Sequence, residues 1–110
     1  MFFARAKSYP LLQVAVSPEG ESAQFRYTLI NDVPRNKSTE TGMRFWTDQK
    51  EDTWELRLAI PLEALPFGDD GAVTVNFFRT WGAHGDFASW TPSLQSNYIA
   101  GLNKFGVLRK

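Results

Sequence analysis

The sequence contains no cysteine and only one histidine among its 110 residues. The absence of cysteine excludes disulfides, thiol nucleophiles and thiolate metal ligands. There is also no block of like charge, because 12 basic and 12 acidic residues are scattered and cancel to a formal net charge of zero. Without a basic stripe, nucleic acid is not an expected partner. No run of eighteen apolar residues predicts a membrane span, and no signal peptide is recognisable.

Sequence motifs of catalysis are missing as well. There is no nucleophile elbow, no zinc-protease motif and no phosphate-binding loop. His84 stands in a glycine-containing segment, where we expect an exposed side chain and not a catalytic base. Asp69 and Asp70 are neighbours at a turn, whereas glycosidases need carboxyl groups that face each other across a cleft. We therefore expect no enzyme and no cofactor. Calcium bound through Asp69, Asp70 and Asp86 is the lesser alternative, since no loop has calcium-binding spacing.

The clearest pattern lies in Trp54–Phe67. Large apolar residues alternate there with polar or small ones, which predicts a strand with one buried face. Pro61 ends this strand because proline cannot donate to a ladder, and Leu62–Leu65 can then form one helical turn. The apolar side is broad enough to predict the central strand of a sheet. Its members are Trp54, Leu56, Leu58, Ile60 and Leu62.

The rest of the chain reads as short strands separated by turns. Leu11–Val16 and Ser22–Ile30 should form an antiparallel hairpin, and Gly42–Asp48 should form another with the strand that starts at Trp54. The polar stretch Asn31–Thr41 reads as a surface loop. This pattern predicts one all-β domain over residues 1–110, an antiparallel β-sandwich of about six to eight short strands. The further expected strands are Met1–Ala4, Val73–Trp81, Phe87–Thr91 and Phe105–Leu108.

Two kinds of residue are candidates for ligand contact. Trp46 falls on the more polar face of its strand, and Tyr98 stands beside Asn97 in an aperiodic segment. An aromatic ring next to amide and hydroxyl groups suits a sugar, whose C–H face covers the ring. Arg26 shares the polar side of its strand with Gln24 and could grip adjacent sugar hydroxyls. The alternatives are aromatic side chains that close the ends of the sandwich and a solvated strand face.

Four motifs occur in order: Trp54-Glu-x-x-x-x-Ile-Pro-Leu-x-x-Leu, Val75-Asn-Phe-Phe-Arg, Ser89-Trp-Thr-Pro and Phe105-Gly-Val-Leu. Together they resemble the second half of the carbohydrate-binding module family 9-like domain, a β-sandwich related to the DOMON group. The resemblance covers nearly the whole chain. It implies binding of poly- or oligosaccharides without catalysis, in an extracellular or periplasmic protein of polysaccharide degradation. It also implies that strands preceding Met1 are missing, so that the sandwich is incomplete at its N-terminus and self-association through an uncovered sheet edge is expected.

The resemblance assigns the binding residues. Arg26 matches the arginine that grips the sugar, Tyr98 takes the place of an aromatic platform, and Asn97 is a possible hydrogen-bond donor beside it. Phe78 stands where the family has a polar residue, which weakens the sugar site. The second platform tryptophan and an acidic ligand would lie at or before Met1 and are missing. The alternative is a structural or protein-interaction module that binds no sugar.

Overall fold

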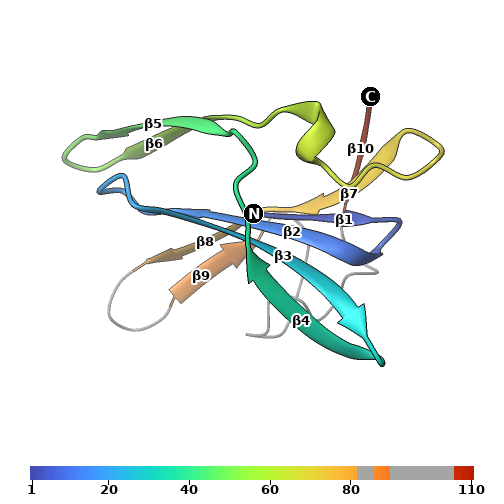
Figure 1. Cartoon of the computed structure of the whole chain (residues 1–110). Coiled ribbons are helices and arrows are strands. Elements are labelled where there is room, and N and C mark those ends of the chain that lie inside the picture. Colours follow the sequence, from blue (N-terminus) through green and yellow to red (C-terminus); the bar gives the residue numbers. More distant parts are fainter. Residues whose placement is uncertain (82–85, 90–105) are drawn as a thin grey trace.

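The computed structural model of this chain describes residues 1–81, 86–89 and 106–110. It is all-β and antiparallel, with a sandwich-like arrangement of sheets (Figure 1). The only helical element in the described residues is η1, a 3₁₀ turn over Leu62–Ala64. The strands are β1 Phe2–Arg5, β2 Ser8–Val16, β3 Ser22–Ile30, β4 Val33–Ser38, β5 Arg44–Gln49, β6 Trp54–Ala59, β7 Ala72–Asn76, β8 Phe78–Trp81, β9 Asp86–Ser89 and β10 Gly106–Arg109.

The main sheet has six strands in the order β10-β7-β1-β2-β3-β4. β1 lies near its middle, where Phe3 pairs with Leu12 of β2 and with Val75 of β7. The predicted hairpin of β2 and β3 is present, and Ala15 pairs with Ala23 near its turn. At one edge, β4 carries Pro34 and two charged side chains, Arg35 and Lys37, which discourage pairing with another chain.

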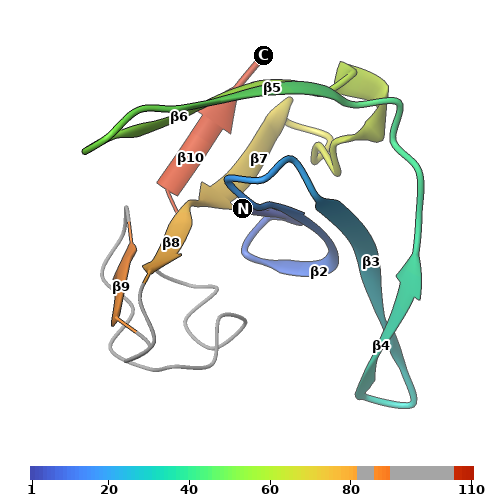
Figure 2. The same cartoon turned by 90° about the vertical axis from the view of Figure 1, so that its left-hand side faces the viewer.

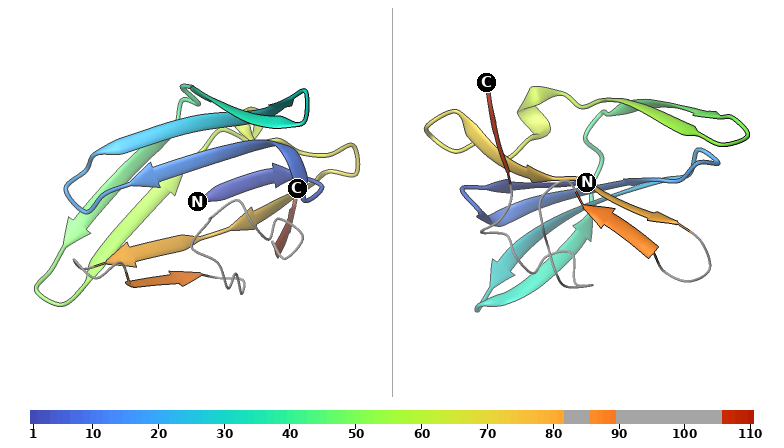
Figure 3. Two further views of the ribbon diagram at one scale, coloured as in Figure 1. Left: turned by 90° about the horizontal axis from the view of Figure 1, so that it is seen from below. Right: turned by 180° about the vertical axis from the view of Figure 1, so that it is seen from behind.

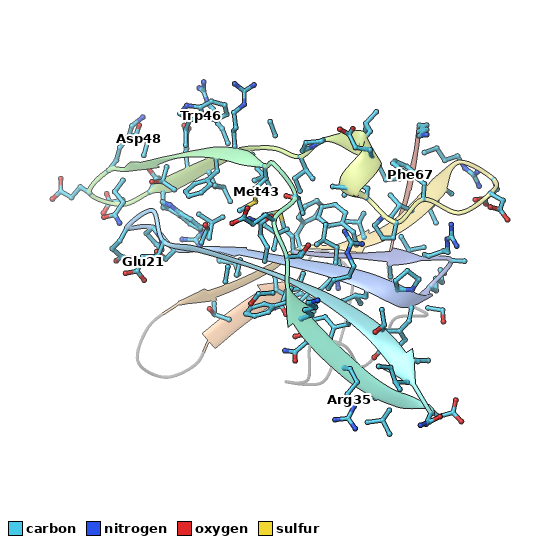
Figure 4. The ribbon with its side chains drawn as sticks, in the orientation of Figure 1. Glu21, Arg35, Met43, Trp46, Asp48 and Phe67 are labelled. Atoms are coloured by element: carbon cyan, nitrogen blue, oxygen red, sulfur yellow. The ribbon has the colours of Figure 1, made fainter. Side chains whose placement is uncertain are left out.

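The hydrophobic core lies between the six-stranded sheet and a second layer formed by the β5–β6 hairpin and η1 (Figures 1 and 2). The sheet contributes Phe3, Leu12 and Val73 among others, all buried. The second layer covers them with partly buried apolar side chains, and Met43 points into this space in Figure 4. These covering residues are Met43, Leu58, Ile60, Leu65 and Phe67.

The opposite face of the sheet carries a second cluster around Phe2, Ala4 and Leu11. Phe78 of β8 packs edge-on against Phe2, with ring centroids 5.8 Å apart and planes at 87°. Thr74 is buried on this face, and its hydroxyl donates to the Ala4 carbonyl at 2.8 Å. The sheet is therefore apolar on both faces near β1, which is why the large fully buried side chains lie in β2 and β7, the two strands beside β1.

The prediction that Trp54–Ile60 is the central strand is wrong. Among the described strands β6 pairs with β5 alone, in a two-stranded sheet, and its apolar side chains are half-buried. The predicted hairpin itself is present, with Trp46 opposite Arg57, and the helical turn after Pro61 is present as η1. An alternating pattern indicates one buried face, but it does not indicate how many strands lie beside it.

Two further boundaries differ from the predicted ones. Within the expected loop Asn31–Thr41, Val33–Ser38 forms β4, because a tight turn folds this polar stretch back onto β3. The expected single strand Val73–Trp81 is divided between β7 and β8, and Phe77 at the break is 43% exposed instead of sharing the core face. These two changes account for the ten strands found in residues 1–81, 86–89 and 106–110, where eight segments were expected.

The β1–β2 turn is strained, which leads to a stability prediction. Ala6 and Lys7 have φ of 49° and 61°, and Arg5 pairs with Ser8 across them. A two-residue turn with both φ positive favours Asn-Gly. The double substitution Ala6→Asn/Lys7→Gly should raise the free energy of unfolding by about 1 kcal/mol. Each left-handed non-glycine residue costs about 1 kcal/mol, and the greater freedom of glycine in the unfolded chain offsets part of the gain from relieving both. Urea denaturation measures it, and a loss of stability would contradict the strain.

Candidate functional site

Trp46 lies on the outer face of the β5–β6 hairpin, pointing away from the core, and is 55% exposed (Figure 4). The alternation predicted for this strand places it there, since Phe45 and Thr47 face inward and are half-buried. The Arg44 guanidinium lies over the indole, 5.9 Å from the ring centroid. An exposed tryptophan on a rigid strand pair is a flat apolar surface held at the edge of solvent.

Charged residues surround this ring. Arg57 pairs directly with Trp46 across the hairpin, and Asp48 pairs with Glu55. A pocket of about 350 Å³ is lined by Trp46, Thr47, Asp48, Glu55 and Arg57. Like charges directly opposite each other on a strand pair lower stability, so the pairing of Asp48 with Glu55 does not stabilise the hairpin. The pocket combines an aromatic wall, a guanidinium donor and two carboxylate acceptors.

Arg26 does not extend from a solvated strand face. It pairs with Leu12 of β2 and is therefore on the side of the sheet that faces the second layer. Its side chain is half-buried, and Nη2 donates to the Ala64 carbonyl of η1 at 3.2 Å. Gln24 on the same side accepts hydrogen bonds from the Thr41 backbone N–H and hydroxyl. The polar side of β3 is thus hydrogen-bonded to Thr41, which precedes β5, and to Ala64, which follows β6.

The other two predicted sugar-binding residues, Asn97 and Tyr98, lie outside the described residues, as do His84 and Trp90. Arg26 is therefore the one predicted site residue whose surroundings are known. Asn76, interpreted from the sequence as framework, is fully buried and accepts a hydrogen bond from the Phe77 N–H at 2.9 Å. Phe78 packs within the second cluster, so the substitution that weakens the family's sugar site serves packing here.

A second cavity, of about 890 Å³, lies between the end of β2, the start of β6 and β8. Trp54 borders it, and the Arg79 guanidinium lies 5.8 Å from the centroid of the Trp54 ring. The Trp54 Nε1 atom is buried and has no hydrogen-bond partner in the described part of the chain. Sequence reasoning assigned Trp54 to the core. It could not identify this cavity, because the three strands around it are distant in sequence.

No metal site can be assigned. In residues 1–81, 86–89 and 106–110, no group of three or more histidine or acidic side chains is placed to hold a metal ion. The same residues contain no helix long and apolar enough to cross a membrane. The acidic turn at Asp69 and Asp70 has a structural role instead, since Asp70 Oδ1 accepts a hydrogen bond from the Ala72 N–H at 3.1 Å.

The fold and these surfaces define an all-β, sandwich-like protein with an exposed aromatic pocket and a separate cavity between strands. Comparison with family models, characterised proteins and solved structures finds no match to this chain.

Proposed function

We propose that this protein binds saccharides without transforming them, with Trp46 as a stacking platform. The observation that carries the proposal is the exposed indole at the 350 Å³ pocket, next to Arg57, Asp48 and Glu55. The C–H face of a pyranose covers an aromatic ring, while guanidinium and carboxylate groups bind its hydroxyls as donors and acceptors. The resemblance to the carbohydrate-binding module family 9-like domain, and the extracellular or periplasmic location that it implies, support the same class of ligand.

The resemblance assigns sugar binding to Arg26, Asn97 and Tyr98. Of these, the described Arg26 lies on the side of β3 that faces the second layer, away from the outer face of the hairpin that carries Trp46. Arg26 Nη2 is engaged with Ala64, so this placement leaves the remaining guanidinium nitrogens for a ligand. Trp46 is the more accessible group, since it is 55% exposed. We therefore propose the Trp46 pocket as the principal binding site. The residues that the resemblance assigns, Arg26, Asn97 and Tyr98, are the alternative site.

The test is calorimetric titration with xylo- and gluco-oligosaccharides. Trp46→Ala should weaken binding by about tenfold or more, since loss of a stacking ring costs at least about 1.4 kcal/mol, and Trp46→Phe should retain most of the affinity. Trp46→Ala should leave the free energy of unfolding almost unchanged, because the side chain is exposed. Arg26→Gln is the comparison variant. A larger loss of affinity in Arg26→Gln than in Trp46→Ala would favour the alternative site at Arg26.

No saturable binding of either oligosaccharide series would overturn the proposed function. The alternative is a structural or protein-interaction module. Phe78 favours this alternative, because it packs against Phe2 at the position where the related family has a polar residue.

A further inference from the structure

All groups of the Trp46 pocket belong to one hairpin. Its lining residues come from β5 and β6 alone, and these two strands form the outermost layer at the top of Figure 3 (right), with no described segment over their outer face. Trp46 and Asp48 both point away from the core (Figure 4). A ligand can therefore reach the aromatic ring and the carboxylates of this pocket directly from solvent.

Two of the lining side chains are carboxylates that stand opposite each other, since Asp48 pairs with Glu55. Nearer the turn, the Lys50 N–H donates to the Thr53 carbonyl at 2.8 Å, and hydrogen-bonded pairs recur at every second residue of an antiparallel ladder. Asp48 and Glu55 are therefore a hydrogen-bonded pair, whose Cα atoms lie about 5.5 Å apart with both side chains on the outer face. An ammonium group between them can donate to a carboxylate oxygen on each side, at about 2.8 Å.

The carboxylate pair lies within reach of a sugar that stacks on the indole. Trp46 and Asp48 are two residues apart on β5, which separates them by about 6.5 Å along the strand. A pyranose over the indole extends across roughly half of that distance. An amino substituent on the rim of the sugar ring then comes within hydrogen-bonding distance of the carboxylates. One pyranose can thus contact the indole and both carboxylates at once.

No cation of the chain neutralises this carboxylate pair in the described residues. Neither carboxylate takes part in an ion pair or a side-chain hydrogen bond there, and the Arg44 guanidinium lies over the indole instead. Two opposed carboxylates lower the stability of the hairpin, so a positively charged ligand between them would offset that cost. A calcium ion does not fit, because it takes about six to eight oxygen ligands. In this part of the chain no group of three or more acidic or histidine side chains is placed to hold a metal ion.

Charge is distributed unevenly along the outer face. Arg44 precedes Trp46 by two residues and Asp48 follows it by two. Arg57 stands opposite Trp46. The cations are thus beside the ring or beyond it, and the carboxylates are on the side of the turn. This arrangement favours a ligand whose ammonium group points toward the turn and whose hydroxyl groups lie beside Arg57, which can only donate hydrogen bonds.

We infer that this pocket selects saccharides that carry a protonated amino group, such as oligomers of glucosamine. The inference rests on the proposed function, because it uses Trp46 as the stacking platform. The ammonium group of the stacked sugar donates to Asp48 and Glu55, and Arg57 donates to a sugar hydroxyl. Acetylation of the amine removes its charge, so an N-acetylated sugar loses the charge-assisted hydrogen bonds that provide the selectivity.

The test is calorimetric titration of the full chain with three trisaccharides of equal length: the glucosamine trisaccharide, its N-acetylated form and cellotriose. A mildly acidic buffer of low ionic strength keeps the sugar amine protonated. The glucosamine trisaccharide should bind at least tenfold more tightly than the other two. Added salt should reduce this preference, since it screens charges that are exposed to solvent. Trp46→Ala should weaken the binding of all three, because each stacks on the indole.

Two double variants test the source of the selectivity. Asp48→Asn/Glu55→Gln removes both charges but keeps an acceptor oxygen in each side chain. It should lower the affinity for the glucosamine trisaccharide at least tenfold more than it lowers the affinity for cellotriose. Urea denaturation should find this variant no less stable than the unchanged chain, because the repulsion across the hairpin is gone.

The matched control is Glu51→Gln/Asp52→Asn. It makes the same change in net charge at two exposed residues of the turn that do not line the pocket. This control should keep the preference for the glucosamine trisaccharide.

Equal affinity for all three trisaccharides, with each weakened by Trp46→Ala, would overturn the inference and leave the proposed function in place. No binding of any trisaccharide would overturn both. A preference that survives in Asp48→Asn/Glu55→Gln, or that is lost equally in the control, would contradict the role of these two carboxylates. The peptide acetyl-Gly-Lys-Gly-amide should bind at least tenfold more weakly than the glucosamine trisaccharide. Equal affinity for this peptide would also overturn the inference, since the pocket would then select a cation and not a saccharide.

Discussion

Leu12→Ala is expected to lower the free energy of unfolding by about 3–5 kcal/mol, close to the whole stability of many small domains. Leu12 is fully buried in β2 and pairs with Phe3 of β1 on one side and Arg26 of β3 on the other. Its neighbours are held by ladders on both sides, so the sheet cannot collapse onto the space that the side chain leaves. Removal of the side chain therefore costs both the transfer free energy and the cavity.

Leu58→Ala is the matched comparison, because it truncates a leucine of the same core from the second layer. Leu58 packs on the same core from β6 but is only half-buried, so we expect a loss of about 1–2 kcal/mol. Leu29→Ala, at a position 46% exposed, should change stability by less than about 1 kcal/mol. Urea denaturation at pH 8 measures all three. If Leu12→Ala proves unfolded, Leu12→Val should show a loss of about 1 kcal/mol. A larger loss at Leu58 than at Leu12 would contradict the expectation that the six-stranded sheet contributes more to the stability of the core than the second layer does.

The second large effect is a rise in stability between pH 6 and pH 8. Burial of the Met1 amine lowers its pKa from 8.0 to about 6. The unfolded chain therefore holds this proton up to about pH 8, whereas the folded chain releases it above about pH 6. Since stability rises with pH wherever the unfolded state binds more protons, the free energy of unfolding should increase by about 2–3 kcal/mol across this window.

The control is the same chain with an acetylated amino terminus, because its Met1 amine is blocked and cannot bind a proton. The difference in stability between the free and acetylated chains should change over pH 6–8, and His84→Asn in both removes the one histidine of the chain. Tyr9 does not interfere. Burial, with a smaller effect of Tyr27, raises its pKa from 10.0, so its ionisation affects stability only above the window. A constant difference between the two chains from pH 6 to pH 8 would show that the amine is solvated in the folded protein.

Local patterns predicted the elements that depend on neighbours in sequence. Alternation and turn residues predicted the β2–β3 and β5–β6 hairpins, both of which are present with the expected partners. The same alternation placed Trp46 on the polar side of its strand, where it is now seen to be exposed. Pro61 predicted the end of β6 and the turn η1. In each case the side-chain period or a backbone restriction acts within a few residues.

The candidate sites could be predicted only in part. The resemblance selected Arg26, whose hydrogen bond to Ala64 joins residues 38 apart in the sequence and has no local signature. The cavity beside Trp54 also could not be predicted, because it depends on β2, β6 and β8 meeting where β1 begins. Such contacts follow from the packing of distant segments, which a single sequence does not display.

The sequence by itself determined that this protein is built of short antiparallel strands, since period-two alternation and turn residues allow little else. It also determined which face of each hairpin strand in the second layer is apolar. Only the tertiary structure decided that β1 and β2, and not the better-patterned Trp54 segment, form the centre of the sheet. The physical reason is that burial on both faces comes from layers above and below a strand, whereas the pattern of a strand records only the difference between its two faces.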